Sequence, residues 1–214
     1  MELANVDPFR AAQRAAEEIA RRTGVSKHDV ALTLGSGWQR AADLLGRTTV
    51  EFPADLVEGF SSGAVPGHSG NIRSVRMLNG KHALIIGART HLYENKGVRA
   101  VAHSVRTAAA AGATTMVLTN GAGGIKDSWK PGTPVLISDH INLTASSPLE
   151  GAAFVDLTDL YTPRLRDVAK GIDPSLDEGV YVQFRGPHYE TPAEVQMAKS
   201  FGGHIVGMST ALEA

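Results

Sequence analysis

The sequence predicts a single α/β domain over residues 1–214, with a twisted mixed β-sheet that helices flank on both faces. Apolar runs of strand length alternate with amphipathic helical patterns, which is the order typical of α/β proteins. A chain of 214 residues is long enough for one domain with a substantial core. In sheets of this kind ligands bind at the carboxyl ends of the strands, so we expect a site in the segments that follow them.

The composition excludes several classes of protein. The net charge is −1 and the isoelectric point is about 6.7, which leaves no overall electrostatic footprint for nucleic acid or an anionic membrane. The absence of cysteine excludes disulfides, cysteine-ligated metal centres and thiol nucleophiles. Neither a signal-peptide pattern nor a transmembrane run of about 18 apolar residues occurs. We therefore expect a cytoplasmic protein that binds small molecules and contacts neither nucleic acid nor a membrane.

The first elements along the chain are a helix and a strand. Asp7 followed by Pro8 is typical of a capped helix start, and the apolar spacing that follows predicts a helix ending near Gly24. Residues 30–34 form a short apolar strand that leads into Gly35-Ser36-Gly37 and an alanine-rich helix. This strand–loop–helix unit puts a serine at the carboxyl end of the strand.

A hairpin is predicted next. Residues 71–78 and 81–89 are joined by Asn79-Gly80, and Asn-Gly is the strongest short hairpin signal. The second strand leads to Arg89 and His91. Alternate residues of an extended segment project to the same side, so these side chains would place two potential cations together at a strand end. A simple surface pair is the alternative.

The central strand is predicted at residues 114–119, after a helix at 98–111 with a small-residue face. It breaks into Asn120-Gly121-Ala122-Gly123-Gly124, a segment of small residues that exposes backbone amides. Consecutive N–H groups that point into one concavity can hold a phosphate, and glycine lets the backbone approach it closely. A tight turn without a ligand is compatible with the same pattern.

Further strands are predicted at residues 134–139, 180–184 and 204–208, with an irregular segment at 142–159. Thr191-Pro192 opens a helix between the last two strands, because threonine is a good N-cap and proline suits the first helical position. The alternation of helices and strands thus continues to the end of the sequence.

Two polar residues lie in turn-like segments and have two possible roles each. Glu190 follows a Gly-Pro turn, where its carboxylate is either solvated or held inward to accept hydrogen bonds from N–H groups of a ligand. His68 lies in a glycine-rich loop that is either a lid or a plain surface loop.

Common cofactor motifs are missing from the sequence. Gly35-Ser36-Gly37 starts like the dinucleotide fingerprint, but Arg40 stands where that motif requires its third glycine. No Walker A sequence occurs, and the eight histidines lack spacings typical of zinc sites. We therefore expect no nicotinamide cofactor, no P-loop nucleotide and no metal.

Several short motifs occur in a fixed order. They are Leu34-Gly35-Ser36-Gly37, Gly67-His68-Ser69-Gly70, Arg89-Thr90-His91-Leu92-Tyr93-Glu94, Thr119-Asn120-Gly121-Ala122-Gly123-Gly124, Gly186-Pro187-His188-Tyr189-Glu190-Thr191 and Gly207-Met208-Ser209-Thr210. From about residue 30 onward, the chain resembles the trimeric purine nucleoside phosphorylases that prefer 6-oxopurines. Each motif alone is a weak signal, whereas the ordered set is specific.

The resemblance implies a pentosyltransferase of purine salvage with the nucleoside phosphorylase fold. It would convert inosine, guanosine or their 2′-deoxy forms and inorganic phosphate into the free base and (deoxy)ribose 1-phosphate. Phosphate would be a co-substrate, no cofactor would be needed, and the protein would be a homotrimer. Methylthioadenosine phosphorylase is the alternative within the fold. A non-catalytic protein that binds nucleoside or phosphate is the alternative from another class.

The resemblance also implies roles for individual residues, carried over position by position. The phosphate site would comprise Ser36, His68, Arg89, His91, Gly121, Ala122 and Ser209. The nucleoside site would comprise Tyr93, Asn120, Phe154, Tyr189, Glu190 and Met208. Catalysis would depend on Glu190, His91 and Arg89. Phe154 would enter the ribose pocket of a neighbouring subunit, so that the active site depends on the trimer.

The sequence departs from the family pattern at two places. Gly121 replaces an alanine that is common in the family, which should loosen the loop without abolishing it. The printed sequence ends at Ala214, whereas family members continue through another strand and helix that supply an asparagine for purine N7 and a histidine near the ribose 5′-hydroxyl. We therefore expect a chain truncated at its C-terminus, with base recognition half assembled.

Overall fold

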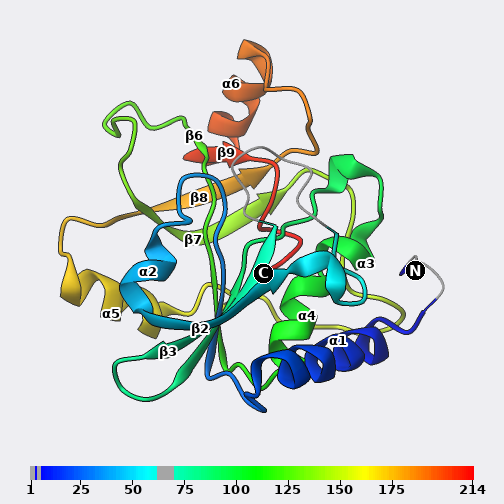
Figure 1. The fold of residues 1–214 in the computed structure, drawn as a ribbon. Helices are drawn as coiled ribbons and strands as arrows, with labels where there is room; N and C mark the ends of the chain where they lie inside the picture. Colours follow the sequence, from blue (N-terminus) through cyan, green and yellow to red (C-terminus); the bar gives the residue numbers. More distant parts are fainter. Residues whose placement is uncertain (1–2, 4–5, 62–69) are drawn as a thin grey trace. The chain divides into compact units, whose positions relative to one another are not determined.

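The computed structural model describes residues 3, 6–61 and 70–214 (Figure 1). The chain forms two compact units, one made by the residues up to Gly121 together with Glu213, the other by Ala122–Leu212 with Ala214. The mixed α/β class with flanking helices is confirmed. The strands form two sheets, where the sequence led us to expect one. The expectation of a single domain over residues 1–214 stays a prediction.

The first unit contains a sheet in the order β2-β3-β4-β1-β5. Its strands are β1 (Val30–Thr33), β2 (Gly46–Pro53), β3 (Asn71–Met77), β4 (His82–Ile86) and β5 (Thr115–Leu118). Strand β1 is parallel to both β4 and β5, whereas β2, β3 and β4 pair in antiparallel fashion. The predicted hairpin is β3 and β4, and Gly80 in its turn has φ 81°. Strand β4 ends at Ile86, so Arg89 lies in the segment after the strand and not within it.

Helices cover both faces of this sheet. They are α1 (Pro8–Thr23), α2 (Ala41–Leu45), α3 (Val98–Val101) and α4 (His103–Ala110), and η3 (Leu92–Glu94) is a short 3-10 turn. Helices α1 and α4 lie side by side on one face (Figure 1), where Ile19 and Ala108 pack with Leu84. Ala42 of α2 packs with Ile85 on the opposite face. Alternating residues of β4 thus supply two cores, and each buried Leu or Ile stabilises the fold by about 1.5–3 kcal/mol.

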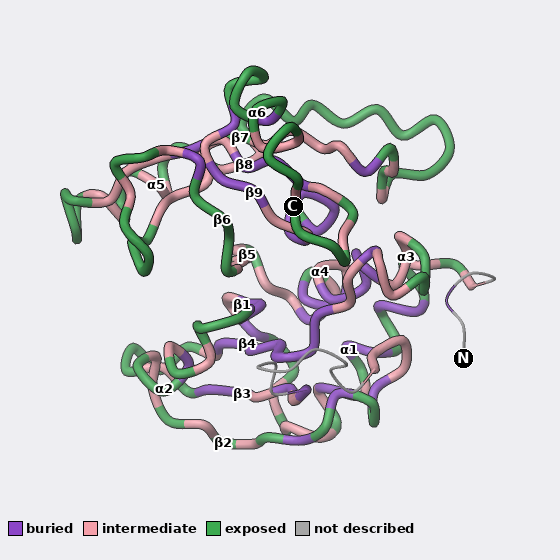
Figure 2. Tube along the Cα trace, turned by 90° about the horizontal axis from the view of Figure 1, so that it is seen from above, coloured by how far each residue is buried: buried purple, intermediate pink, exposed green. Residues whose placement is uncertain are grey.

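Two predictions for this unit were incomplete. The helix expected at 98–111 is two helices, α3 and α4, which meet at Ala102 with ψ −3°. The pattern did not reveal this break because both segments share one small-residue face. Strand β2 was not predicted, since its alternation is mostly polar and only its Phe52 is buried. Buried residues are concentrated on β3, β4 and β1 (Figure 2), which leaves β2 as an edge strand.

The second unit contains a smaller sheet in the order β6-β9-β8-β7. Its elements are β6 (Gly123–Gly124), β7 (Val135–Asn142), α5 (Pro163–Ile172), β8 (Asp177–Gln183), α6 (Pro192–Ser200) and β9 (Ile205–Gly207). Strands β7, β8 and β9 are parallel, and β6 is antiparallel to β9. Val182, Ala198 and Val206 form its core with Ile125. The strands expected in this region are confirmed.

The predicted helix start and loop in the second unit are also present. Thr191 caps α6: its hydroxyl accepts from the Glu194 N–H at 3.3 Å, and the Glu194 carboxylate accepts from the Thr191 N–H at 2.7 Å. Residues 143–162 contain neither helix nor strand, as expected for the irregular segment. None of the helices in the described part of the chain has the length and apolar character that a membrane span requires.

Candidate active site

The predicted site residues are distributed over both units. The first unit holds Ser36, Arg89, His91, Tyr93, Asn120 and Gly121. The second unit holds Ala122, Phe154, Tyr189, Glu190, Met208 and Ser209. His68 lies outside the described residues.

The carboxyl ends of β1, β4 and β5 bring three predicted segments of the first unit to one edge of the sheet. These strands are parallel neighbours, so the segments that follow them begin side by side. The Gly35 N–H donates to the Thr119 hydroxyl at 3.0 Å, and the Trp38 indole donates to the Asn120 carbonyl at 3.1 Å. A Cβ on Gly121 would lie 3.7 Å from the Ser36 Cβ. The serine loop and the glycine loop are therefore in close contact.

Arg89 lies at the same edge and is almost completely buried, with 2% of its side chain exposed. Its Nε lies 3.0 Å from Oε2 of Glu213, and its Nη1 donates to the Thr119 carbonyl at 2.7 Å. Its Nη2 is buried and has no hydrogen-bond partner within the part of the chain that the structure describes. A buried donor without an acceptor destabilises a protein by about 1–3 kcal/mol, so such a donor calls for an explanation, and a bound ligand is one.

His91 is held by its own turn. Its backbone N–H donates to the Glu94 carboxylate at 2.7 Å, and Nδ1 lies 3.4 Å from the same oxygen. The Tyr93 ring stacks on the imidazole with centroids 4.8 Å apart. Burial and the nearby Arg89 hold the pKa of His91 below its ordinary value, although Glu94 opposes this shift. The imidazole is therefore neutral at pH 7 and presents one donor and one acceptor.

Glu190 is the predicted carboxylate of the second unit. It is partly buried, and its Oε1 is shielded from solvent and has no hydrogen-bond partner in residues 3, 6–61 and 70–214. The neighbouring Tyr189 side chain is exposed, as is Phe154 in the irregular segment. A buried carboxylate oxygen without a partner is an acceptor that an N–H group of a ligand can satisfy.

Ser209 lies in a tightly held turn after β9. Its N–H donates to the Tyr181 hydroxyl at 3.2 Å, and its hydroxyl lies 3.2 Å from that of Thr210. Thr210 is buried with φ 84°, a conformation that a β-branched residue adopts only under constraint. A Cβ on Gly207 would collide with the Tyr181 hydroxyl, so glycine is required where the strand passes that ring. Tyr181 and Gly207 thus fix the turn that carries Ser209.

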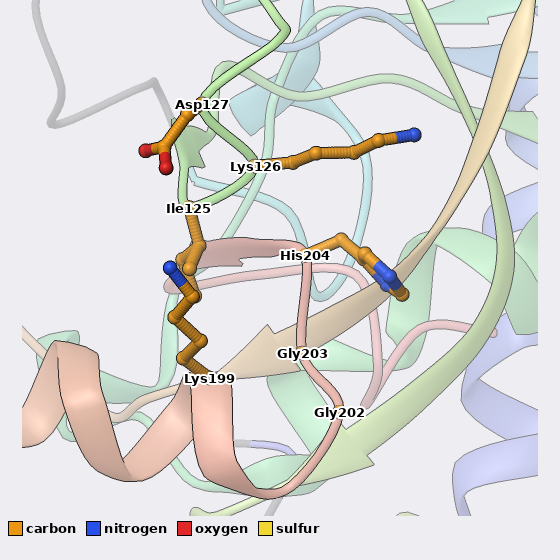
Figure 3. Close-up of a pocket in the computed structure, with 7 residues that line it drawn as sticks. All are labelled: Ile125, Lys126, Asp127, Lys199, Gly202, Gly203 and His204. Atoms are coloured by element: carbon orange, nitrogen blue, oxygen red, sulfur yellow. The ribbon is translucent and has the colours of Figure 1, made fainter.

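The second unit also contains a cavity of about 280 Å³. Its lining consists of Ile125, Lys126, Asp127, Lys199, Gly202, Gly203 and His204. Figure 3 shows that the side chains of Lys126 and Asp127 point in different directions and do not converge on one point. None of the site residues that the structure describes lines this cavity. Among the described residues, no group of three or more His, Asp or Glu side chains could hold a metal ion.

Sequence reasoning missed the residues that position the predicted ones. Glu213 and Thr119 hold Arg89, Glu94 holds His91, and Tyr181 holds the Ser209 turn. Only Glu94 carried a local signal, because it lies three residues after the histidine it contacts. Glu213 is 124 positions from Arg89, and no periodicity connects residues over such a distance.

The geometry defines an α/β protein with a candidate oxyanion site at strand ends, and comparison with known proteins agrees with it. Residues 29–214 match the phosphorylase superfamily. A purine nucleoside phosphorylase from Cellulomonas sp is 61% identical over 97% of this chain and 75% of that protein. One from Mycobacterium tuberculosis is 52% identical over 97% of this chain and 77% of that protein. The chain belongs to the phosphorylase superfamily, among the purine nucleoside phosphorylases.

Solved structures with the same fold carry relevant ligands. A purine nucleoside phosphorylase in complex with ribose-1-phosphate has a TM-score of 0.86 and 30% identity, covering 96% of this chain and 80% of that one. The Schistosoma mansoni purine nucleoside phosphorylase in complex with inosine has a TM-score of 0.84 and 30% identity, covering 95% of this chain and 76% of that one.

Proposed function

We infer that this protein catalyses the phosphorolysis of purine nucleosides such as inosine and guanosine. The products are the free base and ribose 1-phosphate, or deoxyribose 1-phosphate from a 2′-deoxynucleoside. A relative that carries this activity in its name is 61% identical to this chain over 97% of the chain's length. The single observation that carries the inference is the buried Nη2 of Arg89, which has no acceptor among the described residues and lies at the edge where the serine and glycine loops meet.

The phosphate end of the reaction is assigned to Arg89, His91, Ser36 and the backbone at Gly121. The Arg89 guanidinium supplies a positive charge and a free N–H, and a neutral His91 can match a phosphate oxygen or a phosphate hydroxyl. The same proposal assigns three further phosphate contacts, which are His68, Ala122 and Ser209. Phosphate is the co-substrate, and the reaction requires no metal.

The base end is assigned to Glu190. Its partnerless carboxylate oxygen can accept a hydrogen bond from N1–H of a 6-oxopurine. Adenine has no proton on N1, so a carboxylate there would face a lone pair and stay unsatisfied. This asymmetry favours inosine and guanosine over the 6-amino substrates of a methylthioadenosine phosphorylase. Tyr189 and Asn120 would contact the base, and Tyr93, Met208 and Phe154 the ribose.

The chemistry requires charge stabilisation at both ends of the breaking bond. As the C1′–N9 bond breaks, its electron pair goes to the purine and the sugar gains oxocarbenium character. A phosphate oxygen then bonds to C1′, and the purine takes up the proton that hydrogen phosphate gives up. Bound phosphate offsets the sugar cation, while Glu190 holds the N1–H of the electron-rich base. Preorganised groups of this kind act mainly by stabilising the transition state.

From the resemblance to the family, we also propose how the protein assembles and where it is located. A cytoplasmic homotrimer would let Phe154, which is 97% exposed, reach the ribose pocket of the next subunit. An exposed aromatic side chain of this kind is typical of residues that anchor a protein interface. Light scattering tests the assembly directly, and a monomer at assay concentration would contradict the role given to Phe154.

A steady-state assay with inosine and inorganic phosphate tests the function. The expected result is stoichiometric release of hypoxanthine and ribose 1-phosphate that stops when phosphate is omitted. A non-catalytic binding protein would show saturable inosine binding without hypoxanthine. A nucleosidase would release hypoxanthine equally well without phosphate.

A further inference from the structure

We propose that Glu213 is a positioning residue for the phosphate-binding guanidinium of Arg89. It would fix the guanidinium so that Nη2 is the nitrogen left for the oxyanion. This inference rests on the proposed function, because it assigns Arg89 to phosphate. No sequence motif singled out Glu213.

The contact between the two side chains is both short and enclosed. Nε of Arg89 lies 3.1 Å from Oε1 and 3.0 Å from Oε2 of Glu213. The side chains are 2% and 1% exposed, respectively. Water is therefore excluded from the pair, so the carboxylate is the group that satisfies Nε.

A second contact restricts the guanidinium from another side. Nη1 donates to the Thr119 carbonyl at 2.7 Å, and Thr119 directly follows β5, where the glycine loop starts. Since the guanidinium is planar, holding Nε and Nη1 fixes the direction of Nη2 as well. With the hydrogen bond to Thr119 alone, the plane of the guanidinium could still rotate about that bond.

The charge of Glu213 has a second consequence. A buried guanidinium without a counter-charge is strongly disfavoured and would move toward solvent. Glu213 offsets this cost in the absence of substrate, so the arginine stays in place before phosphate arrives. Preorganisation of this kind improves ligand binding because less ordering is required when the ligand binds.

The geometry makes a specific prediction for kinetics. Loss of Glu213 should weaken the phosphate interaction and leave nucleoside binding nearly unchanged. We expect Glu213→Ala to raise the KM for phosphate at least about tenfold and to change the KM for inosine less than about twofold. Glu213→Gln keeps an oxygen that can accept from Nε, so it should recover most of the phosphate affinity.

A matched control is Glu178→Gln. Glu178 is also a carboxylate paired with cations, but it lies in the second unit, and its partners Arg166 and Lys170 are not assigned site residues. The Glu178→Gln variant should leave the KM for phosphate and the KM for inosine unchanged. If Glu213→Ala raises both KM values in proportion, or leaves the phosphate KM within about twofold of wild type, the positioning role is wrong.

Two further measurements keep the proposal falsifiable. If Glu213→Ala does not fold, Glu213→Asp replaces it: the shorter side chain retains the charge but cannot reach Nε equally well, so the phosphate KM should still rise. A wild-type KM in Glu213→Asp would overturn the proposal. Calorimetric titration of inorganic phosphate into the same variants measures Kd without turnover. It tests Glu213 even if wild-type protein fails to cleave inosine, which would refute the proposed function alone.

Discussion

The guanidinium of Arg89 has nitrogens in three different environments. Nε faces the Glu213 carboxylate, Nη1 faces the Thr119 carbonyl, and Nη2 faces no acceptor of the described residues. A lysine at this position would have one nitrogen for all three tasks, so the chemistry of the site depends on the fork and not on charge alone. The same residue thereby connects the end of β5 to the oxyanion that we assign to this edge.

Two glycines near this guanidinium give a matched pair of substitutions. A Cβ on Gly35 would lie 2.5 Å from the Thr119 carbonyl oxygen and 2.6 Å from Arg89 Nη1, whereas on Gly121 it would meet nothing closer than 3.7 Å. Gly35→Ala should therefore lower the free energy of unfolding by about 1–3 kcal/mol and raise the KM for phosphate, because it displaces both groups. Gly121→Ala should change the free energy of unfolding by less than about 0.5 kcal/mol.

Chemical denaturation and phosphate-dependent kinetics on both variants check this prediction. Gly121→Ala serves as the control because it adds the same methyl group at the neighbouring loop. Equal losses in the two variants would mean that the loops tolerate no side chain at all. An unchanged Gly35→Ala would contradict the contact between Gly35 and Arg89.

Glu190 determines the choice of base in this account. Glu190→Gln keeps the shape of the side chain but removes the charge and adds N–H donors. The kcat/KM for guanosine should fall by at least about tenfold, the loss expected when a charged hydrogen-bond partner is removed, while that for adenosine should fall less. Competing guanosine and adenosine in one assay measures the ratio directly. A ratio unchanged from wild type would remove the argument against a 6-amino substrate.

At the scale of elements, β8 supports the turn after β9 through one hydroxyl. Tyr181→Phe removes only the oxygen that accepts from the Ser209 N–H. The free energy of unfolding should fall by about 1 kcal/mol, and the KM for phosphate should rise about three- to tenfold because Ser209 is no longer held. Thermal unfolding and steady-state kinetics provide both numbers.

Tyr161→Phe is the control for this prediction. The Tyr161 hydroxyl lies 2.8 Å from Nδ1 of His140 in the same unit, and neither residue is an assigned site residue. The Tyr161→Phe variant should show a similar fall in the free energy of unfolding and an unchanged KM for phosphate. A phosphate effect of equal size in both variants would point to general loosening and not to Ser209.

Local signals predicted most elements. Asp7 and Gly24 cap α1 at both ends, Asn79-Gly80 turns the hairpin, and the Thr191 capping box starts α6. Strand β2 escaped prediction because an edge strand of mostly polar residues lacks the apolar run that marks a buried one. The division into two sheets depends on long-range pairing of strands, which periodicity does not encode.

The candidate site, too, was only partly predictable from local sequence patterns. The sequence placed Ser36, Arg89 and Gly121 after predicted strands, and the family resemblance grouped them in one site. In the structure the strands that they follow are parallel neighbours. The residues that hold them in position were not predictable, because Glu213 and Tyr181 look like ordinary charged and aromatic positions in the sequence. Their roles depend on contacts between segments far apart in the chain.

For the whole molecule, the buried His28 predicts a loss of stability in acid. His28 is 1% exposed, contacts the Ser74 hydroxyl at 2.9 Å, and burial lowers its pKa from 6.5 to about 4. Between these values the unfolded chain binds a proton that the folded chain does not. The free energy of unfolding therefore falls as the pH decreases from 6.5 to 4, by about 3 kcal/mol from this group.

Denaturant unfolding at several pH values measures this slope in wild type and in His28→Gln. The glutamine variant starts less stable, but it lacks the titrating imidazole, so its free energy of unfolding should decrease less steeply over the same range. His103 and His91 are also buried with lowered pKa values and remain in both proteins, so their contributions cancel in the difference. Parallel slopes would contradict the neutral, buried state of His28.

The central claim is that Arg89 and its surrounding loops bind an inorganic phosphate that attacks the nucleoside. The initial rate of hypoxanthine release from inosine, measured as a function of phosphate concentration, tests it most directly. We predict a rate that rises with phosphate, saturates, and vanishes when phosphate is removed. A rate independent of phosphate would contradict the claim.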